Sequence, residues 1–309
     1  MEIVKKMSKN SIENNKSTYI PVSGEGLIKV DDAIKIYKRG KIEVVALRGL
    51  NCEFHAGEIT VIMGPSGCGK TTLLNVIGGL DRLSSGRIIV NGVDIAQFTD
   101  KEMEQYRRKK IGFVFQFLNL IPELTAEENI LLPLELSHSL NKASKEFVDS
   151  LLDIVGLSER KKHRPDELSG GEQQRVSVAA ALANNPYIIL CDEPTGELDT
   201  ASKRVIMELL RSIIEKFPDK TMIIVSHDPE LKAIADRLYY IRDGAISHKF
   251  SKEELQALKS QEEAQIFGDF ESQQSDPARA HEIALLELRE VDHYVKEKIE
   301  KIEKKIHPM

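Results

Sequence analysis

The chain contains a glycine-rich stretch whose residue types suit the binding of phosphate groups. Residues 64–71 read Gly-Pro-Ser-Gly-Cys-Gly-Lys-Thr and fit the pattern G-x-x-x-x-G-K-[ST]. Glycines let the backbone turn tightly and direct successive N–H groups at phosphate oxygens. Lys70 is expected to reach the β- and γ-phosphates, and the Thr71 hydroxyl is expected to bind Mg²⁺. The stretch predicts a nucleoside triphosphate site made of Gly64, Pro65, Ser66, Gly67, Cys68, Gly69, Lys70, Thr71 and Thr72.

Two apolar runs further along the chain end in polar residues. Residues 187–191 precede Asp192 and Glu193, and residues 222–225 precede Ser226, His227 and Asp228. Open α/β sheets bind ligands beyond the carboxyl ends of their strands, so we expect these groups to share one composite site. Asp192 and Glu193 could instead form only a solvated acidic turn, but the apolar run before them disfavours that interpretation.

Two further features suit the recognition of a nucleotide. Ser169, Gly170 and Gly171 open a helical apolar stripe, which would present backbone N–H groups and a helix N-terminus to an anion. Tyr37 precedes the phosphate loop and could stack on a base, although an isolated tyrosine is more often a packing residue.

The elements that position these residues follow from hydrophobic periodicity. Residues 59–63 predict a buried strand, and Leu73, Leu74, Val76 and Ile77 predict a helix with one buried face. Short apolar runs from Leu27 onward, with a hairpin signal at residues 91–92, predict a small β layer ahead of and behind the loop. Residues 117–164 are mostly helical in pattern. Residues 117–124 are unusually apolar, and they predict either subdomain core or an apolar docking surface.

Composition limits the class of protein. The 309 residues are 41% hydrophobic and 30% charged, which is typical of a globular protein, and the net charge of −6 gives no indication of nucleic-acid binding. Three widely spaced cysteines favour a reducing compartment. The polar N-terminus lacks the apolar core of a signal peptide, and no run of about eighteen apolar residues occurs. We therefore expect a cytoplasmic chain.

Taken together, these motifs resemble those of the ATP-binding subunits of ABC transporters over residues 27–247. Gln116 stands in the place of the family's Q-loop, and residues 168–173 read as its signature, Leu-Ser-Gly-Gly-Glu-Gln. The strand ending in Asp192 resembles the Walker B strand, residues 197–199 the D-loop, and His227 the switch histidine. Tyr37 lies where the family keeps an adenine-stacking aromatic residue.

Three phrases are similar to a narrower group, the lipoprotein-releasing and macrolide-export type, whose membrane partners move substrate by a mechanical stroke. They are residues 77–81, 115–120 and 183–186. Two positions depart from that group, because Ala180 replaces a usual arginine and Glu197 a common asparagine. Neither belongs to the predicted catalytic set.

The resemblance implies a P-loop NTPase core with a mostly parallel sheet flanked by helices, an N-terminal antiparallel β layer and an inserted helical subdomain at about residues 117–180. It implies ATP and Mg²⁺ as ligands, with Thr71, Gln116 and Asp192 at the metal and Glu193 polarising the attacking water. His227 would contact the γ-phosphate, and Lys70 would neutralise its charge. The signature Ser169, Gly170 and Gly171 would cover ATP held by a second subunit, so we expect a head-to-tail homodimer.

The chain divides into three expected parts: a polar tail at residues 1–26, a nucleotide-binding domain at 27–249 and a charged helical extension at 250–309. In the extension, an apolar seam predicts a coiled coil or a helix folded back on the domain, with an unknown partner. Its residues are Leu288, Val291, Val295, Ile299, Ile302 and Ile306.

The leading hypothesis is a transporter ATPase, peripheral at the inner face of the cell membrane through a transmembrane permease subunit, that powers export or lipoprotein or lipid extraction. One alternative is an ATPase that regulates a membrane complex, of the cell-division type, without moving substrate. A third is an ABC-type ATPase acting on ribosomes or nucleic acid, although such relatives usually carry two ATP domains or a long coiled coil.

Overall fold

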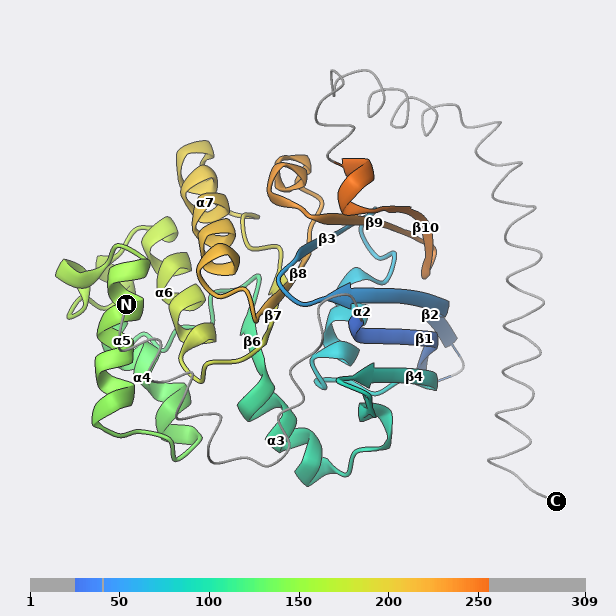
Figure 1. Cartoon of the computed structure of the whole chain (residues 1–309), viewed down its shortest axis with the longest axis horizontal. Coiled ribbons are helices and arrows are strands. Elements are labelled where there is room, and N and C mark those ends of the chain that lie inside the picture. The colour runs from blue at the N-terminus through green and yellow to red at the C-terminus, as the bar shows by residue number, and fades with distance from the viewer. Residues whose placement is uncertain (1–25, 41, 256–309) are drawn as a thin grey trace.

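A computed structural model describes residues 26–255 with the exception of residue 41. Residues 1–25 and 256–309, which hold most of the expected tail and extension and the whole apolar seam, lie outside the described residues. Two sheets and two groups of helices form the rest of the chain (Figure 1).

The larger sheet has six strands in the order β10-β9-β3-β8-β7-β6, and all neighbours except β10 and β9 run parallel. Every residue of β3, β7 and β8 is buried, as is typical of parallel strands covered on both faces. This confirms the mostly parallel sheet that the sequence predicts. The strands are β3 (Ile59–Met63), β6 (Ile111–Val114), β7 (Ile188–Asp192), β8 (Thr221–Val225), β9 (Arg237–Arg242) and β10 (Ala245–Phe250).

The smaller sheet is antiparallel, with four strands in the order β2-β1-β4-β5. Its strands are β1 (Gly26–Arg39), β2 (Ile42–His55), β4 (Ser85–Val90) and β5 (Val93–Asp94). Asn91 and Gly92 join β4 to β5 with φ values of 49° and 77°, the left-handed conformations that a two-residue hairpin turn requires. The predicted β layer and its hairpin are therefore confirmed.

The helices begin and end at recognisable signals. Thr125 and Glu128 form a capping box at the start of α4, and Gly156 follows α5 with a left-handed φ of 67°. The α-helices are α2 (Lys70–Ile77), α3 (Asp100–Lys110), α4 (Ala126–Leu136), α5 (Lys142–Ile154), α6 (Gly170–Leu182) and α7 (Thr200–Lys216). Short 3₁₀ turns are η1 (Ile95–Gln97), η2 (Ser158–Arg160), η3 (Pro165–Glu167) and η4 (Pro229–Ile234).

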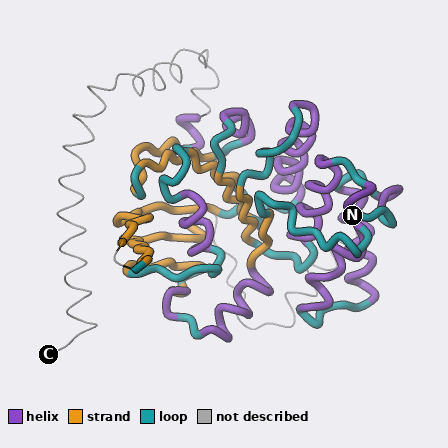
Figure 2. Tube along the Cα trace, turned by 180° about the vertical axis from the view of Figure 1, so that it is seen from behind, coloured by secondary structure: helices purple, strands orange, loops and turns teal. Residues whose placement is uncertain are grey.

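The six-stranded sheet separates two hydrophobic cores. Along β8, Met222 and Ile224 face the core that holds α4, α5, α6 and α7, whereas Ile223 and Val225 face the core that holds α2, α3 and the antiparallel sheet. This alternation follows from the two-residue period of a strand. Figures 1 and 2 show the same division, with α4, α5 and α6 on one side of the molecule and the antiparallel sheet on the other. Helices α2 and α6 therefore cover opposite faces of the sheet.

No helix in the described ranges combines the length and the apolar composition needed to cross a membrane.

Candidate active site

The carboxyl ends of four parallel strands meet at one edge of the large sheet. Strand register pairs Ile62 of β3 with Val225 of β8, Val225 with Asp192 of β7, and Cys191 with Val114 of β6. The segments that follow these strands are the phosphate loop, residues 226–228, Glu193 and Gln116 respectively. The fold therefore places the predicted groups along a single edge.

The phosphate loop requires glycine at two positions because other backbone lies against it. Gly64 has φ of 152°, and a Cβ there would lie 2.1 Å from the Ile241 carbonyl oxygen. Gly69 caps α2 with φ of 105°, and a Cβ there would lie 2.4 Å from the Ala46 oxygen. Pro65, Ser66 and Gly67 are exposed, so the tip of the loop is open to a ligand.

The Lys70 side chain is folded into the loop and is 8% exposed. Its Nζ donates hydrogen bonds to the carbonyl oxygens of Gly64 at 2.7 Å and Pro65 at 3.0 Å. A phosphate group would offer the ammonium group a charged acceptor in place of these neutral ones, and charge-assisted hydrogen bonds are the stronger kind. Cys68 is buried inside the loop, and burial raises the pKa of its thiol. It therefore fills space there as a neutral side chain.

Thr71 and Asp192 bring two oxygen atoms together beside the loop. Thr71 Oγ1 donates a hydrogen bond to Asp192 Oδ1 at 3.2 Å. Burial raises the pKa of Asp192, and the neighbouring charge of Glu193 acts in the same direction, while the Thr71 hydroxyl and Lys70 oppose them. A hydroxyl and a carboxylate are oxygen ligands of the kind that Mg²⁺ prefers, and a bound cation would relieve the cost of burying this carboxylate. The residues present fit Mg²⁺.

Glu193 is held by three donors from the segment after β8. Its Oε2 accepts hydrogen bonds from Ser226 Oγ at 2.6 Å and from the His227 backbone N–H at 3.3 Å, and its Oε1 accepts one from His227 Nδ1 at 2.9 Å. Because a carboxylate can only accept, Nδ1 carries the hydrogen. Glu193 also has a φ of 48°, a left-handed conformation that is uncommon outside glycine, and its backbone N–H donates to Val225. Strained backbone of this kind is often found at functional sites.

Gln116 follows β6 at the same edge, and its side chain is exposed. Within the part of the chain that the structure describes, it makes no hydrogen bond to Thr71 or Asp192. The structure thus brings Thr71 and Asp192 together, and leaves Gln116 nearby without a direct contact to either.

The signature residues lie elsewhere. Ser169 caps α6, its Oγ accepting from the Glu172 N–H at 3.3 Å, and α6 packs on the sheet face opposite α2. A Cβ on Gly171 would lie 2.9 Å from Ser202 Oγ, whereas one on Gly170 would meet only Leu198 at 3.9 Å. One chain therefore does not join its own signature to its own phosphate loop.

Tyr37 lies on β1 and is 41% exposed. Its hydroxyl donates to Asp81 Oδ2 at 2.8 Å, and Asp81 follows the C-terminal end of α2. The structure therefore places Tyr37 beside the helix that begins with Lys70.

Sequence reasoning missed two residues that contact the predicted site. Ser226 belongs to the predicted polar triplet after β8, but nothing in the triplet indicates that its hydroxyl binds Glu193. Asp81 belongs to the phrase at residues 77–81 that resembles the family, yet it binds Tyr37, which lies 44 residues away in the chain. Neither contact has a local sequence signal, because each depends on which strands become neighbours.

The loop, the acidic pair and the histidine at one edge of a parallel sheet define a nucleoside triphosphatase of the phosphate-loop class. Residues 47–196 match the family described as ABC transporter. An ABC transporter ATP-binding protein of Thermotoga maritima is 45% identical over 220 residues, which cover 71% of this chain and 93% of that protein. The chain belongs to the ATP-binding proteins of the ABC transporter family.

Two other relatives bear on the subgroup that the sequence resembles. The lipoprotein-releasing system ATP-binding protein LolD of Bacteroides thetaiotaomicron is 42% identical over 220 residues, covering 71% of this chain and 99% of that protein. The macrolide export ATP-binding/permease protein MacB of Brucella melitensis is 42% identical over 234 residues, covering 76% of this chain but 36% of MacB. The predicted resemblance is confirmed.

A solved structure confirms the fold. The dimeric, post-hydrolysis structure of the cassette MJ0796 of Methanocaldococcus jannaschii, bound to ADP and Pi, has a TM-score of 0.67 and 39% identity. The match covers 73% of this chain and 98% of that one. The chain is an ATP-binding, ATP-hydrolysing subunit of an ABC transporter.

Proposed function

We propose that this chain hydrolyses ATP at a site closed by a second copy, and thereby powers export, or the extraction of lipoproteins or lipids, by a separate membrane subunit. The names of LolD and MacB support this direction and favour transport over the regulation of a division complex or action on ribosomes. The dimeric MJ0796 structures support the homodimer. The chain would then lie at the inner face of the membrane through its permease, with the domain at residues 27–249 as the motor.

The observation that carries the hydrolytic role is the fixed carboxylate of Glu193. Three hydrogen bonds from Ser226 and His227 set its orientation at the edge that also holds the phosphate loop. In this role Glu193 polarises the attacking water, His227 contacts the γ-phosphate, and Lys70 leaves its two carbonyl partners for the phosphates.

The remaining predicted residues bind and cover the nucleotide. The loop from Gly64 to Thr72 holds the phosphates, and the exposed ring of Tyr37 stacks on adenine. Thr71, Asp192 and Gln116 would hold Mg²⁺, which when bound neutralises phosphate charge. Ser169, Gly170 and Gly171 cover the ATP of the partner subunit with the N-terminus of α6.

Substitution of Glu193 tests the proposal. Glu193→Gln keeps the side-chain size but removes the negative charge, so ATP binding should persist while turnover falls by about 100-fold or more. Because ATP would remain uncleaved, the variant should elute as a dimer in size-exclusion chromatography with ATP. Glu208→Gln, an exposed position on α7, is the matched control and should turn over as the wild type does. Near-normal turnover of Glu193→Gln would remove Glu193 from this role.

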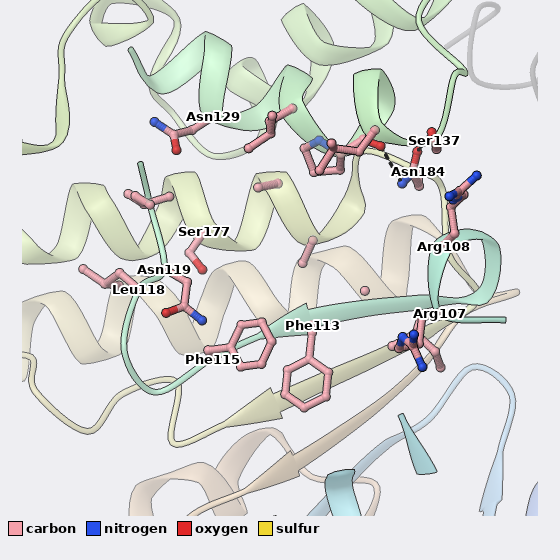
Figure 3. Close-up of a pocket in the computed structure, with 18 of the residues that line it drawn as sticks. Arg107, Arg108, Phe113, Phe115, Leu118, Asn119, Asn129, Ser137, Ser177 and Asn184 are labelled. Atoms are coloured by element: carbon pink, nitrogen blue, oxygen red, sulfur yellow. Dashed lines mark hydrogen bonds between the residues drawn. The ribbon is translucent and has the colours of Figure 1, made fainter. Parts of the chain in front are cut away.

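A groove next to Gln116 is the proposed contact with the membrane subunit. It encloses about 520 Å³ between α3, β6, α4 and α6, and residues 115, 118, 132 and 136 give it apolar walls. Figure 3 shows Phe113 and Phe115 on one side, with Arg107 and Arg108 at one end. Leu136 is 66% exposed at the groove, and the neighbouring Phe117 is 70% exposed.

The exposure of Phe117 bears on the two interpretations of residues 117–124. Leu120 packs against the core of the helical group, whereas Phe117 and Ile121 face solvent. Leu120 therefore fits the core interpretation, and the exposure of Phe117 and Ile121 supports the docking interpretation for their part of the segment. Exposed aromatic and aliphatic side chains beside an apolar groove are typical of an interaction surface.

Site-directed cross-linking tests this contact. The native cysteines are buried, so a photoreactive maleimide on Phe117→Cys would report mainly from this surface. In membranes of the source cell, we expect adducts with a protein that has membrane spans. Val93→Cys on the exposed β5 is the matched control and should give none. Adducts with ribosomal proteins from Phe117→Cys would contradict the proposal.

A further inference from the structure

Asp81 joins two parts of the nucleotide site, the antiparallel sheet that carries Tyr37 and the phosphate loop that follows β3 of the larger sheet. Its Oδ2 accepts a hydrogen bond from the Tyr37 hydroxyl at 2.8 Å, and its Oδ1 accepts one from Lys35 Nζ at 2.5 Å. The Arg82 backbone N–H also donates to Oδ1 at 2.7 Å. Both carboxylate oxygens are therefore engaged, and two of the three donors are side chains of β1.

Asp81 is fixed to the helix that carries the phosphate loop. It follows α2 by a short turn, in which the N–H groups of Leu80 and Asp81 both donate to the carbonyl oxygen of Asn75. Helix α2 begins at Lys70, so the carboxylate and the loop lysine belong to one rigid unit.

Lys35 decides which face of the Tyr37 ring is open. Its Nζ lies 4.8 Å from the ring centroid, so the ammonium group covers one face in a cation–π contact. The Lys35 amino group is itself tied to Asp81 and to the Arg82 carbonyl oxygen at 2.8 Å. Tyr37 as a whole is still 41% exposed, so a base can stack only on the face of the ring that Lys35 leaves free.

We infer that Asp81 is a positioning residue, which sets the distance and angle between the ring that receives the base and the loop that receives the phosphates. The inference rests on the proposed role of Tyr37 as the adenine platform. A mobile ring must be ordered each time a nucleotide binds, and side-chain ordering opposes binding. A ring fixed in advance by Asp81 and Lys35 removes that cost, so the affinity for ATP depends on a carboxylate that does not touch ATP.

Two substitutions distinguish the effect of the Tyr37–Asp81 hydrogen bond on ATP affinity from the effect of the aromatic ring itself. Tyr37→Phe keeps the stacking face and removes the hydroxyl, and Asp81→Ala removes its acceptor. We expect each to raise the KM for ATP by about fivefold, the range of one hydrogen bond, with kcat within about twofold. The double variant should be no worse than the stronger single variant, because both changes break the same contact.

Inorganic triphosphate is the probe that distinguishes positioning from general damage. It binds the phosphate loop but offers no base, so its affinity by calorimetry should be the same in Tyr37→Phe, Asp81→Ala and the wild type. Asp100→Ala is the matched control, because Asp100 pairs with the neighbouring Arg82 at 2.8 Å and its own side chain is exposed. It should leave both affinities unchanged.

The outcomes separate this inference from the proposed function. If Tyr37→Ala leaves ATP affinity unchanged, Tyr37 is not the adenine platform. The proposed role of Tyr37 and the positioning role of Asp81 then both fail. If Tyr37→Ala weakens ATP binding while Tyr37→Phe and Asp81→Ala do not, the platform stands and the positioning role of Asp81 is wrong. Equal losses of affinity for ATP and for inorganic triphosphate in Asp81→Ala would also overturn the positioning role. Should Asp81→Ala unfold, Tyr37→Phe decides alone.

Discussion

Asp228 fixes the turn that presents His227, the residue proposed to contact the γ-phosphate. Its Oδ2 accepts hydrogen bonds from Lys203 Nζ at 2.7 Å and from Thr195 Oγ1 at 3.2 Å, and its Oδ1 accepts one from the Glu230 N–H at 3.1 Å. Its own N–H donates to Ser226 Oγ at 3.0 Å. Since that hydroxyl donates in turn to Glu193, the carboxylate of Asp228 helps to orient the residue proposed to polarise water. Catalytic geometry thus depends on a residue outside the predicted catalytic set.

This network makes stability depend on pH in a defined direction. Burial would raise the pKa of Asp228, but the hydrogen bond from Lys203 and the other donors outweigh it and lower the pKa below its ordinary value. A carboxylate with a depressed pKa in the folded state contributes stability in full above its ordinary, unfolded pKa. That contribution is lost as the pH falls through the lower, folded pKa.

Asp228→Asn should therefore lower the free energy of unfolding by about 1–3 kcal/mol at neutral pH, because Lys203 loses a charged partner. The gap from the wild type should narrow as the pH is lowered from about 5 towards 3, where Asp228 itself becomes protonated. Urea denaturation across this pH range measures the difference in unfolding free energy between the variant and the wild type. Asp219→Asn, at an exposed position, is the control. A gap that stays constant with pH would show that the charge of Asp228 is not responsible.

At the scale of elements, β6 approaches α6 so closely that only glycine fits between them. A Cβ on Gly112 would lie 2.2 Å from the Ala181 carbonyl oxygen and 2.9 Å from Pro186 Cγ. The obstacle includes backbone, which cannot rotate away as a side chain can. This contact sets the position of β6 against the end of α6, and with it the segment that carries Gln116 and the groove.

Gly112→Ala should cost about 1–3 kcal/mol of unfolding free energy, as overpacked cores do. Because the strain falls where β6 meets α6, the proposed contact of Phe117 with the membrane subunit should weaken as well. Denaturant unfolding measures the first effect and the cross-linking yield from Phe117→Cys the second. Wild-type stability in Gly112→Ala would mean that α6 can move away without cost.

The sequence predicts some elements well for physical reasons that are local. Strands β3, β7 and β8 are buried along their whole length, so each forms a continuous apolar run. The Asn91-Gly92 turn and the Thr125 cap depend on a few adjacent residues. Strands β1 and β2 extend over 14 residues each, well beyond the short runs that indicate them, because polar side chains at exposed positions such as Lys29, Asn51 and Glu53 interrupt the pattern.

Contacts between distant segments have no such signal. The sequence indicates that Glu193 and His227 follow two strands, but the bond between them exists because β7 and β8 are neighbours with Asp192 beside Val225. The link from Tyr37 to Asp81 likewise requires β1 to lie over the end of α2. The sequence pattern therefore predicts which residues could take part in the site, and the packing of the strands and helices determines which of them form hydrogen bonds with each other.

At the scale of the whole molecule, the two halves of the proposed site lie on opposite faces of one sheet. The phosphate loop leads into α2, and Ser169, Gly170 and Gly171 open α6, which packs in the other core. A second copy, placed head to tail, can supply the missing signature to each loop, so two such contacts close into a symmetric dimer. Each complete site would then take its parts from two chains.

This arrangement predicts complementation between two inactive variants. Lys70→Ala removes the loop cation, and Gly170→Asp places a negative charge where the partner's phosphates would lie. Gly170→Asp should fold normally, since a Cβ there has no neighbour closer than Leu198 at 3.9 Å.

In a mixed dimer of the two variants, one site carries both defects and the other carries neither. An equimolar mixture of the two variants should therefore recover about a quarter of wild-type ATP turnover, because half of the dimers are mixed and half of their sites are intact. Each variant alone should have almost no activity, and a mixture that stays inactive would show that the two motifs do not act across the dimer with independent sites.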